Sequence, residues 1–519
     1  MEIIHPRVYE DRITHLSTEL HSNILRLLPF KTVIEMSTLS RQWKAIVKDF
    51  LPYVENIEFL YEENVEIDEF IDNVNKFCHL HRSPVIRSVK INFAWADPSI
   101  EEHKRELNRW IEFAARKSVN DLDVYCPLYD EWSDLFVVPN LLFACLSITS
   151  LKLSDCRFNP PRTFGGLKSL RFLYLQEAYI SNKAFKATLE NCLLLEELTL
   201  WDCYTESKMR ILAPKDSQIK ILLVIQSHPY DSEDEIPTHL AREIKVAAPN
   251  LKKFCIYGRL FDKYQFQNHL SLEEVCIDST VNNRAEKEMY FEDYFDHLRL
   301  LRDACNIKIL TIYEEVIADV SELGMRYDLK DELHFNLPIT MPNLQELQIC
   351  LGMRLTKKYL VDIYAFFNNF RFPKLEKLFI EVGYHDYGMY ESYSNREESE
   401  EEEGDGSLTL QVRMVKFTHF HGSKAEYKLL KFVLRKATLL ELMVVVAAKK
   451  SDLEKYIIDV QQSTGNSSEF SVRLQQLAKE SGDAKVLLCR EGEVNLFPTQ
   501  TKLDWHSFNA KVDQVRFKV

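Results

Sequence analysis

A short arrangement of apolar positions recurs along most of this chain. Each copy has an apolar residue, two other residues, a second apolar residue, one other residue and a third apolar residue. Because alternate residues of a β-strand point to the same face, the second and third apolar residues are expected to share one core. We therefore predict one short strand per copy. The copies are Ile86-Val89-Ile91, Val119-Leu122-Val124, Ile148-Leu151-Leu153, Leu170-Leu173-Leu175, Leu195-Leu198-Leu200, Ile219-Leu222-Val224, Leu251-Phe254-Ile256, Leu272-Val275-Ile277, Ile307-Leu310-Ile312, Leu344-Leu347-Ile349, Leu375-Leu378-Ile380, the weaker Val412-Val415-Phe417, and Leu439-Leu442-Val444.

The segments between these copies predict amphipathic helices. One opens near Pro98 and carries Leu107 and Trp110 on one face, and Ser181 caps another that carries Phe185. Further helices are expected within 284–304 and 356–370. Strands that alternate with helices, in units too small to bury their own apolar face, are typical of a stacked α/β solenoid. Successive copies are 21 to 37 residues apart, so we expect an irregular horseshoe.

The region before the first copy has a different period. Residues 11–50 predict three short helices, the first capped by Ser17 and stopped by Pro29. Its apolar residues surround most of the first helix: Leu20, Ile24, Leu25, Leu27 and Leu28. The second helix presents Val33, Met36 and Leu39, and the third, from about Ser40, presents Trp43, Ile46 and Val47. About forty residues hold too small a core to be stable alone, so this segment is expected to dock on a partner.

Residues 11–52 resemble an F-box. The resemblance rests on Leu16, Glu19, Leu20, Ile24, Leu25, Leu28-Pro29, and Leu39-Ser40-Arg41 followed after one residue by Trp43. In that family the module binds a Skp-type adaptor, which links it to a cullin and a ubiquitin-conjugating enzyme. The resemblance implies that the adaptor is bound by Leu16, Leu20, Ile24, Leu25, Leu28, Pro29, Leu39 and Trp43.

Two positions depart from the F-box pattern. Ser17 stands where proline is usual, and Gln42 stands where arginine or lysine is usual. Serine caps a helix well, so the first change is expected to cost little. The second leaves the strength of adaptor binding open.

The rest of the chain carries two further resemblances. Residues 80–382 look like degenerate leucine-rich repeats, and 408–480 look like the FBD region that follows such repeats in many plant F-box proteins. There a strand, a helix and a last strand end the array, here expected within 412–446, and they would shield the edge of the last repeat. Another helix is expected over 471–481, and residues 482–519 support no structural prediction.

Charge and composition narrow the class of protein. The net charge is −14, and 391–406 alone contains eight acidic residues and one arginine, which predicts a disordered acidic insert. No basic face indicates nucleic-acid binding. The sequence contains no run long enough to span a bilayer and no signal peptide. Eleven cysteines without such a signal are best explained as reduced thiols, which predicts a cytoplasmic or nuclear location.

The motifs of catalysis and of metal binding are missing from the sequence. It has no glycine-rich phosphate loop, Gly-x-Ser-x-Gly elbow, Cys-x-x-Cys pair or His-Glu-x-x-His helix. Cys156 and Cys203 follow predicted strands, where small buried residues close a turn. Two further groups, Cys78-His79 with His81 and His419 with His421 on one strand face, supply too few ligands for a structural zinc site. We therefore expect no cofactor, no metal and no enzyme activity.

The face of the predicted sheet opposite the core is the remaining candidate surface. The position after each copy carries large aromatic residues at Trp201, Tyr257 and Tyr313. Such residues on an exposed sheet are candidate substrate-binding anchors. The alternative is that inserted loops or helices cover them.

These features predict a non-catalytic substrate receptor of an SCF-type ubiquitin ligase, in which the F-box binds the adaptor and the repeats bind a client protein. One alternative is an F-box interaction protein that acts outside degradation. Another is a repeat receptor for a small ligand, although the positions after each copy show no basic pocket. Client and pathway cannot be read from the sequence.

Overall fold

The computed structural model describes residues 13–61, 65–93, 101–127, 135–226, 241–258, 261, 263–267, 269–278, 296–304, 306–325, 338–352, 354–383, 409–447 and 484–489. The predicted acidic insert 391–406, the predicted helix 471–481 and most of 482–519 lie outside these residues. The chain divides into two compact units, which are described separately. Unit 1 is Met1–Glu206 with Asp216–Ile219 and Arg516–Val519, and unit 2 is Ser207–Lys215 with Lys220–Val515.

Unit 1 begins with the three short helices that the sequence predicts. They are α1 (Thr18–Arg26), α2 (Phe30–Met36) and α3 (Arg41–Phe50), followed by the 3-10 turn η1 (Leu51–Tyr53). The hydroxyl groups of Ser17 and Ser40 accept hydrogen bonds from Leu20 N and Trp43 N, so serine caps both α1 and α3. Helix α1 ends at Arg26, three residues before the predicted stop at Pro29, and Pro29 stands at the N-cap of α2.

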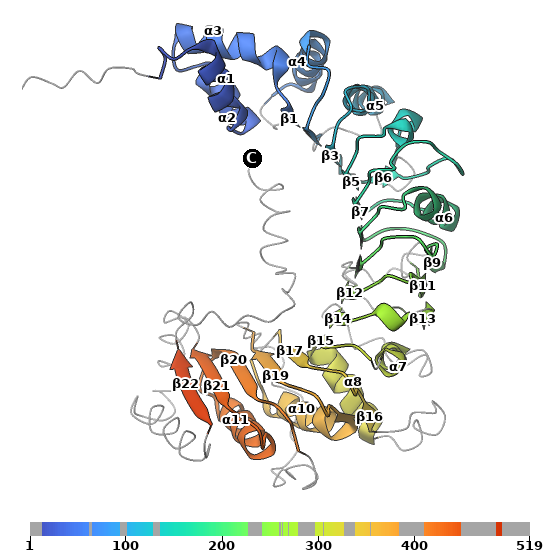
Figure 1. Cartoon of the computed structure of the whole chain (residues 1–519), viewed down its shortest axis with the longest axis vertical. Coiled ribbons are helices and arrows are strands. Elements are labelled where there is room, and N and C mark those ends of the chain that lie inside the picture. Colours follow the sequence, from blue (N-terminus) through green and yellow to red (C-terminus); the bar gives the residue numbers. More distant parts are fainter. Residues whose placement is uncertain are drawn as a thin grey trace, which may run out of the picture. The chain divides into compact units, whose positions relative to one another are not determined.

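A parallel, in-register sheet follows, with its strands side by side in Figure 1. Helices α4 (Ile67–Leu80), α5 (Glu101–Arg116) and α6 (Asn182–Asn191) all lie on one face of it (Figure 1). The unit also contains the 3-10 turn η3 (Asn140–Ala144) and the short parallel pair β4 (Phe136–Val137) and β6 (Cys156–Arg157). The sheet strands are β1 (Asn56–Leu60), β2 (Ser88–Asn92), β3 (Asp121–Tyr125), β5 (Ser150–Ser154), β7 (Phe172–Gln176) and β8 (Glu197–Trp201).

The register of these strands explains the recurring apolar positions. Val89 pairs with Leu122, Leu122 with Leu151, and so on through Leu173 and Leu198, all of which are buried. Each copy therefore places its apolar residues at the same depth of one continuous core. The ladder also includes β1. Its buried residues Val54, Ile57 and Phe59 have the same spacing, so they form one more copy before the first that was predicted.

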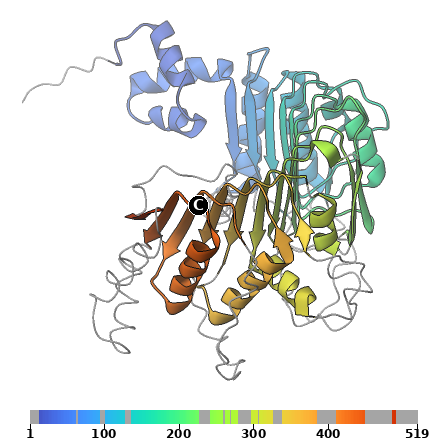
Figure 2. The same ribbon diagram turned by 60° about the horizontal axis from the view of Figure 1, so that its bottom comes forward.

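The main strands of unit 2 also form a parallel ladder, which is in register except for a shift between Phe417 and Phe420. Figure 2 shows helices α10 (Lys357–Asn369) and α11 (Lys424–Lys436) against one face of it. Further helices are α7 (Asp296–Asp303), α8 (Glu314–Met325) and the 3-10 turn η4 (His269–Ser271). The ladder consists of β10 (Ile221–Gln226), β12 (Lys253–Gly258), β14 (Glu274–Asp278), β15 (Ile309–Tyr313), β17 (Glu346–Cys350), β19 (Lys377–Glu381), β20 (Met414–Phe420), β21 (Leu442–Ala447) and β22 (Lys485–Cys489).

A second, smaller sheet in unit 2 takes the place that helices occupy elsewhere. Strands β9 (Lys208–Leu212), β11 (Glu243–Ala247) and β13 (Lys263–Gln267) pair in parallel. The Phe266 ring of β13 lies 5.0 Å from the Phe254 ring of β12, so this sheet covers the core side of the main ladder. Another short parallel pair is β16 (Ile339–Thr340) and β18 (Phe370–Arg371). The sequence analysis did not predict the small sheet.

The last copy of the apolar pattern is out of register by one residue. Met443 and Val445 of β21 pair with Val415 and Phe417 of β20 and are buried, whereas Leu439 is 46% exposed. The prediction of Leu439-Leu442-Val444 is therefore wrong at this strand. A run of consecutive apolar residues from Leu442 onward has no alternation that would fix the register.

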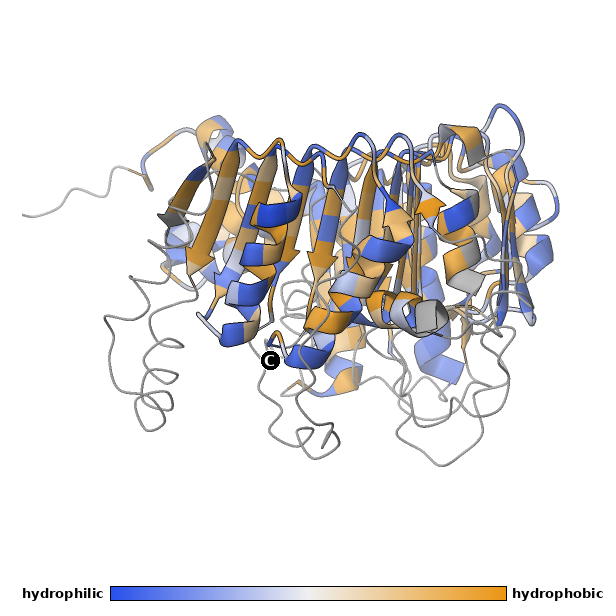
Figure 3. Cartoon of the chain, turned by 90° about the horizontal axis from the view of Figure 1, so that it is seen from below, coloured by the Kyte–Doolittle hydropathy of each residue, from blue (hydrophilic) through white to orange (hydrophobic). Residues whose placement is uncertain are grey.

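In Figure 3 the strands of the ladder are largely hydrophobic, and the visible helices alternate hydrophobic and hydrophilic stretches.

Candidate functional site

Helix α1 has two apolar faces, one turned inward and one outward. His21 and Leu25 are buried, and their spacing of four residues places them on one face. Leu20 is 48% exposed and Leu27 is 86% exposed. Together with half-buried Ile24 they follow the four- and three-residue spacing of a neighbouring face, which Leu27 continues at the C-cap. A stripe of exposed and half-buried leucine and isoleucine side chains therefore runs along α1.

The inward face of α1 completes a small core. Trp43 and Val47 of α3 and Val33 of α2 are buried with Leu25, and the Trp43 ring meets His21 edge-on at 5.5 Å. Two predicted adaptor-binding residues, Leu25 and Trp43, thus lie inside this core. Their side chains hold the helices together and are not available at the surface.

The other predicted adaptor-binding residues have varying exposure. Leu16 and Leu28 are half-buried like Ile24, while Pro29 is exposed. Leu39, between α2 and α3, is 66% exposed. Exposed apolar residues that the resemblance did not single out are Ile13, Leu27 and Ile34. We call Leu20, Leu27, Ile34 and Leu39 the docking patch, because each is at least 40% exposed and lies on the helical segment 18–50.

The helical segment is joined to the first repeat by packed side chains. Helix α2 contacts β1. The Phe30 ring lies 5.8 Å from that of Phe77 on α4, which lies 5.6 Å from that of Phe59 on β1. Arg26 of α1 forms an ion pair with Glu55 at 3.8 Å. These contacts fix the docking patch relative to β1 and α4.

His81 belongs to the same junction. Its ring is buried, and Nε2 lies 2.8 Å from the carbonyl oxygen of Val54. Burial lowers the pKa of His81, the contact with Val54 raises it, and the charge of Lys117 lowers it. The Lys117 ammonium donates to the carbonyl oxygens of His81 and Ser83 at 3.3 and 2.9 Å. His81 is thus engaged in holding the junction.

Burial disfavours the thiolate form of the cysteines that the sequence analysis singled out. Burial raises the pKa of Cys78 and of Cys203 to about 12, and it raises that of Cys156 as well. The Cys203 thiol donates to the Leu175 carbonyl oxygen at 3.3 Å. Thiols held in the protonated form are poor nucleophiles and poor metal ligands.

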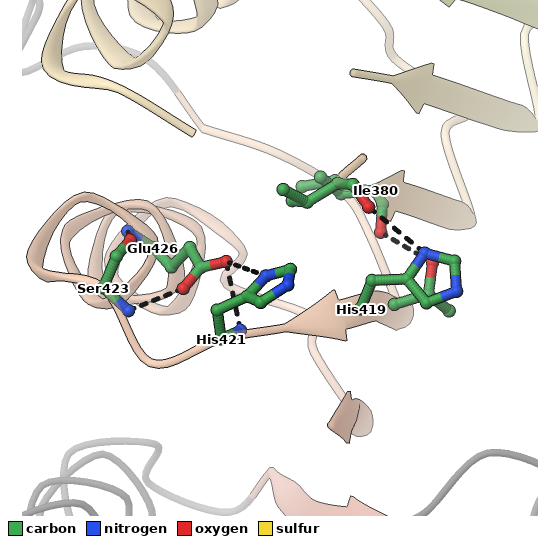
Figure 4. A network of polar contacts seen from close by, with 7 residues as sticks. Ile380, His419, His421, Ser423 and Glu426 are labelled. Atoms are coloured by element: carbon green, nitrogen blue, oxygen red, sulfur yellow. Dashed lines mark hydrogen bonds and ion pairs between the residues drawn. The ribbon is translucent and has the colours of Figure 1, made fainter. Parts of the chain in front are cut away.

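The two histidines near the end of β20 do not act together. The pairing of β20 shifts register between Phe417 and Phe420, and His419 adopts a left-handed conformation with φ of 60°. In Figure 4 His421 faces Glu426 of α11, while His419 is turned away from it. The prediction that both share one strand face is therefore wrong. Across the described stretches, no group of three or more histidine, cysteine, aspartate or glutamate side chains is arranged to hold a metal ion.

The predicted aromatic anchors are less accessible than an exposed sheet would make them. Trp201 in unit 1 is 5% exposed, Tyr257 in unit 2 is 2% exposed, and Tyr313 is half-buried. Tyr257 pairs in register with Asp278, which is itself buried. Burial raises the pKa of both tyrosines well above the ordinary value, and the neighbouring Cys276 and Cys350 thiols, respectively, raise it further.

A polar row on the same face of unit 1 is more open. Glu58, Lys90, Asp123 and Lys152 occupy one register position on successive strands, and their charges alternate. Lys152 is exposed and the other three are half-buried. Burial raises the pKa of Asp123, while Lys152 and Lys90 lower it. The sequence analysis considered only the position after each copy and missed this row.

Known proteins match the chain in two parts. Residues 79–473 match the family described as At1g61320/AtMIF1, LRR domain, and residues 13–55 match the F-box domain. The first match covers more than half of the chain. No helix within the described ranges is long and apolar enough to cross a membrane.

Similar proteins from Arabidopsis thaliana carry related names. The FBD-associated F-box protein At4g13985 is 25% identical over 325 residues, 61% of this chain and 67% of that protein. The F-box/FBD/LRR-repeat protein At3g26920 is 30% identical over 193 residues, 37% of this chain and 42% of that protein. The FBD-associated F-box protein At5g38590 is 28% identical over 207 residues, 39% of this chain and 48% of that protein. The chain spans less than half the length of the last two. It is an F-box protein with leucine-rich repeats, and it belongs to the family of the At1g61320/AtMIF1 LRR domain.

Proposed function

We propose that this protein is a non-catalytic substrate-recognition subunit of an SCF-type E3 ubiquitin ligase. The docking patch is the observation that supports this most strongly. The core of the helical segment is already filled by Leu25, Val33, Trp43 and Val47, yet Leu20, Leu27, Ile34 and Leu39 stay open to solvent. An exposed group of large apolar side chains on a small helical segment favours a protein partner. In an F-box, that partner is a Skp-type adaptor.

The predicted adaptor-binding residues then have two roles. Leu20, Ile24 and Leu39, with Pro29 and the half-buried Leu16 and Leu28, contact the adaptor, and exposed Leu27 and Ile34 join them. Leu25 and Trp43 act as positioning residues, because they are buried in the core that orients the helices. Burying one leucine contributes about 1.5–3 kcal/mol, so a few of these contacts are sufficient for stable association.

The repeats supply the second half of the proposal. Within each unit, one parallel strand per copy with stacked apolar residues is the arrangement of a leucine-rich-repeat solenoid. We infer that β20, α11 and β21 correspond to the FBD-like region. The expectation that they end the array is wrong, because β22 pairs with β21 and extends the ladder by one strand. The client protein binds the sheet face opposite the core. There the polar row of unit 1 is more accessible than Trp201 or Tyr257.

The mechanism on this proposal is proximity. The adaptor brings the cullin and the ubiquitin-conjugating enzyme, and the repeats hold the client where its lysines can be reached. Converting a bimolecular encounter into one within a single complex raises the rate without any catalytic residue in this chain. The contacts among Phe30, Phe77 and Phe59 support this role, because they fix the adaptor-binding segment against the first repeat.

Co-purification with a purified Skp-type adaptor and a cullin tests the proposal. Wild-type protein is compared with Leu27→Asp, and Leu270→Asp in unit 2 is the matched control. Leu27 is 86% exposed and Leu270 is 87% exposed, so neither change disturbs a core. We expect Leu27→Asp to lose at least about tenfold in affinity, since burying a carboxylate against an apolar surface costs more than 1.4 kcal/mol. Leu270→Asp should bind like the wild type. If the wild type captures neither protein, the proposed function is wrong.

A further inference from the structure

The turn before α1 is fastened to α3 by one side chain. The Nε2 amide of Gln42 donates a hydrogen bond to the carbonyl oxygen of Thr14 at 3.2 Å, across 28 residues of sequence. Thr14 is only 5% exposed, so the acceptor lies against the body of the helical segment. Gln42 is the residue that departs from the usual arginine or lysine of an F-box.

A second side chain holds the neighbouring carbonyl group. Nε2 of His21 lies 2.9 Å from the carbonyl oxygen of Ile13, and the His21 ring packs edge-on against Trp43. Leu16 N donates to the same Ile13 oxygen at 3.1 Å, which closes the turn. The backbone at residues 13 and 14 is therefore attached to both α1 and α3. We call residues 13–17 the leading turn.

The leading turn lies directly before α1 and is held against it. Leu16 precedes the N-cap residue Ser17, whose backbone is extended, so the turn does not continue the helical spacing of Leu20, Ile24 and Leu27. It is kept beside α1 by the contact between His21 Nε2 and the Ile13 carbonyl oxygen. Ile13 is 54% exposed and Leu16 is half-buried. A segment that must be ordered when a partner binds loses conformational entropy in that step, whereas a segment already held in place does not.

We propose that Gln42 is a positioning residue for adaptor binding, because it ties the leading turn to α3 and so keeps Ile13 and Leu16 ordered beside α1 before the adaptor binds. This inference rests on the proposed function. It assigns the unusual residue a purpose inside the chain, and it makes the surface offered to the adaptor longer than α1 itself. Gln42 need not touch the adaptor for this effect.

The test compares wild-type chain with Gln42→Met and Gln42→Lys. Methionine matches glutamine in length and carries no charge but cannot donate a hydrogen bond. Lysine keeps a donor on a side chain of similar reach and should restore the contact. Two quantities are measured on each full-length protein: the dissociation constant for a purified Skp-type adaptor, and the hydrogen–deuterium exchange rate of the Leu16 amide.

We expect Gln42→Met to bind the adaptor about threefold to tenfold more weakly, the effect of one hydrogen bond. The Leu16 amide should exchange faster, and the unfolding temperature should stay the same, because Gln42 is exposed and outside the core. Gln42→Lys should recover most of the affinity. That rescue separates positioning from a general loss of stability.

Two results would overturn the inference and can be told apart. If the wild type binds the adaptor and Gln42→Met binds equally well, the leading turn does not contribute, and the proposed function stands. If the wild type does not bind the adaptor at all, the proposed function and this inference fail together.

Discussion

Gly166 and its neighbour Gly165 show how strongly one position can depend on its surroundings. A Cβ added to Gly166 would meet the Ala144 carbonyl carbon and would lie 2.5 Å from Phe143 O and 2.6 Å from Cys145 N. These are backbone atoms and cannot move aside as a side chain can. A Cβ added to Gly165 would have nothing within 4 Å. Only the first glycine is required by close packing.

Gly166→Ala is therefore expected to destabilise unit 1 by about 1–3 kcal/mol, as overpacking does elsewhere. Gly165→Ala should stay within about 0.5 kcal/mol of the wild type. Thermal unfolding of both variants checks this. Equal unfolding temperatures for the two variants would show that the loop at Phe143–Cys145 yields freely.

His81 gives a pH dependence to the junction between the helices and the first repeat. Burial lowers its pKa below 6.5, so the folded state binds fewer protons than the unfolded state as the pH falls through that value. Stability is then present above about pH 6.5 and is lost between that pH and the lower folded pKa. His81→Gln keeps a donor for Val54 O and cannot titrate. Between pH 7.5 and 5.5 the unfolding temperature of the wild type should fall further than that of His81→Gln. Unfolding temperatures that fall in parallel would contradict a role of His81 in this pH dependence.

At the residue scale, sequence pattern alone left inside and outside of α1 undecided. Apolar residues surround that helix, so Leu25 and Leu27 were equivalent until the position of Trp43 and Val33 was known. For the same reason the resemblance marked Leu25 and Trp43 as contacts and passed over Leu27. Exposure depends on neighbours far away in the sequence, which a single periodic pattern does not contain.

At the scale of elements, the strands were predictable because every copy must fill the same place in a shared core. The copies from Ile86 to Phe417 keep the predicted register, and their apolar residues are buried. The strands β9, β11 and β13 were missed because β9 and β11 each bury only two residues, such as Ile244 and Val246, and no residue of β13 is fully buried. Such an alternation is too short to mark a strand. The helix caps at Ser17, Ser181 and Ser423 follow local sequence and could be predicted.

The start of α11 depends on a buried carboxylate. Glu426 is 1% exposed and accepts hydrogen bonds from Ser423 N at 2.6 Å and His421 N at 3.2 Å. Ser423 Oγ accepts from Glu426 N at 3.2 Å, which completes a capping box visible in Figure 4.

Glu426→Ala removes the acceptor for both backbone N–H groups and should cost about 2–3 kcal/mol. Ser423→Ala should cost about 1 kcal/mol. Lys424→Ala, an exposed change in the same turn, is the control and should be nearly neutral. Unfolding by urea ranks the three variants. The description of this cap fails if Glu426→Ala is as stable as Lys424→Ala.

At the scale of the molecule, the helical segment and the first repeats of unit 1 share one core. Phe59 lies 6.2 Å from the Trp110 ring, which lies 5.0 Å from that of Phe93, so the aromatic contacts that start at Phe30 continue into α5 and β2. The Pro52 carbonyl oxygen accepts hydrogen bonds from the amides of Arg82 and Ser83. The F-box and the repeats are therefore separate families by sequence, but their side chains pack together in one core.

A chain that begins at residue 53 should therefore be less stable in unit 1 than the full chain. Loss of the helical segment removes Phe30 from its contact with Phe77 and removes the Pro52 acceptor. Calorimetry of both proteins should show a lower unfolding temperature for the transition of unit 1 and no change for that of unit 2. If the transitions of the truncated chain coincide with those of the full chain, the repeats fold independently of the helical segment.

The central proposal is that the docking patch of the helical segment binds a Skp-type adaptor. Hydrogen–deuterium exchange of the full chain, with and without saturating adaptor, tests it most directly. We predict slower exchange within residues 13–28 and 36–40 and unchanged exchange in the strands of unit 2. A complex that forms with protection confined to the repeats, or without any change in α1, would contradict the proposal.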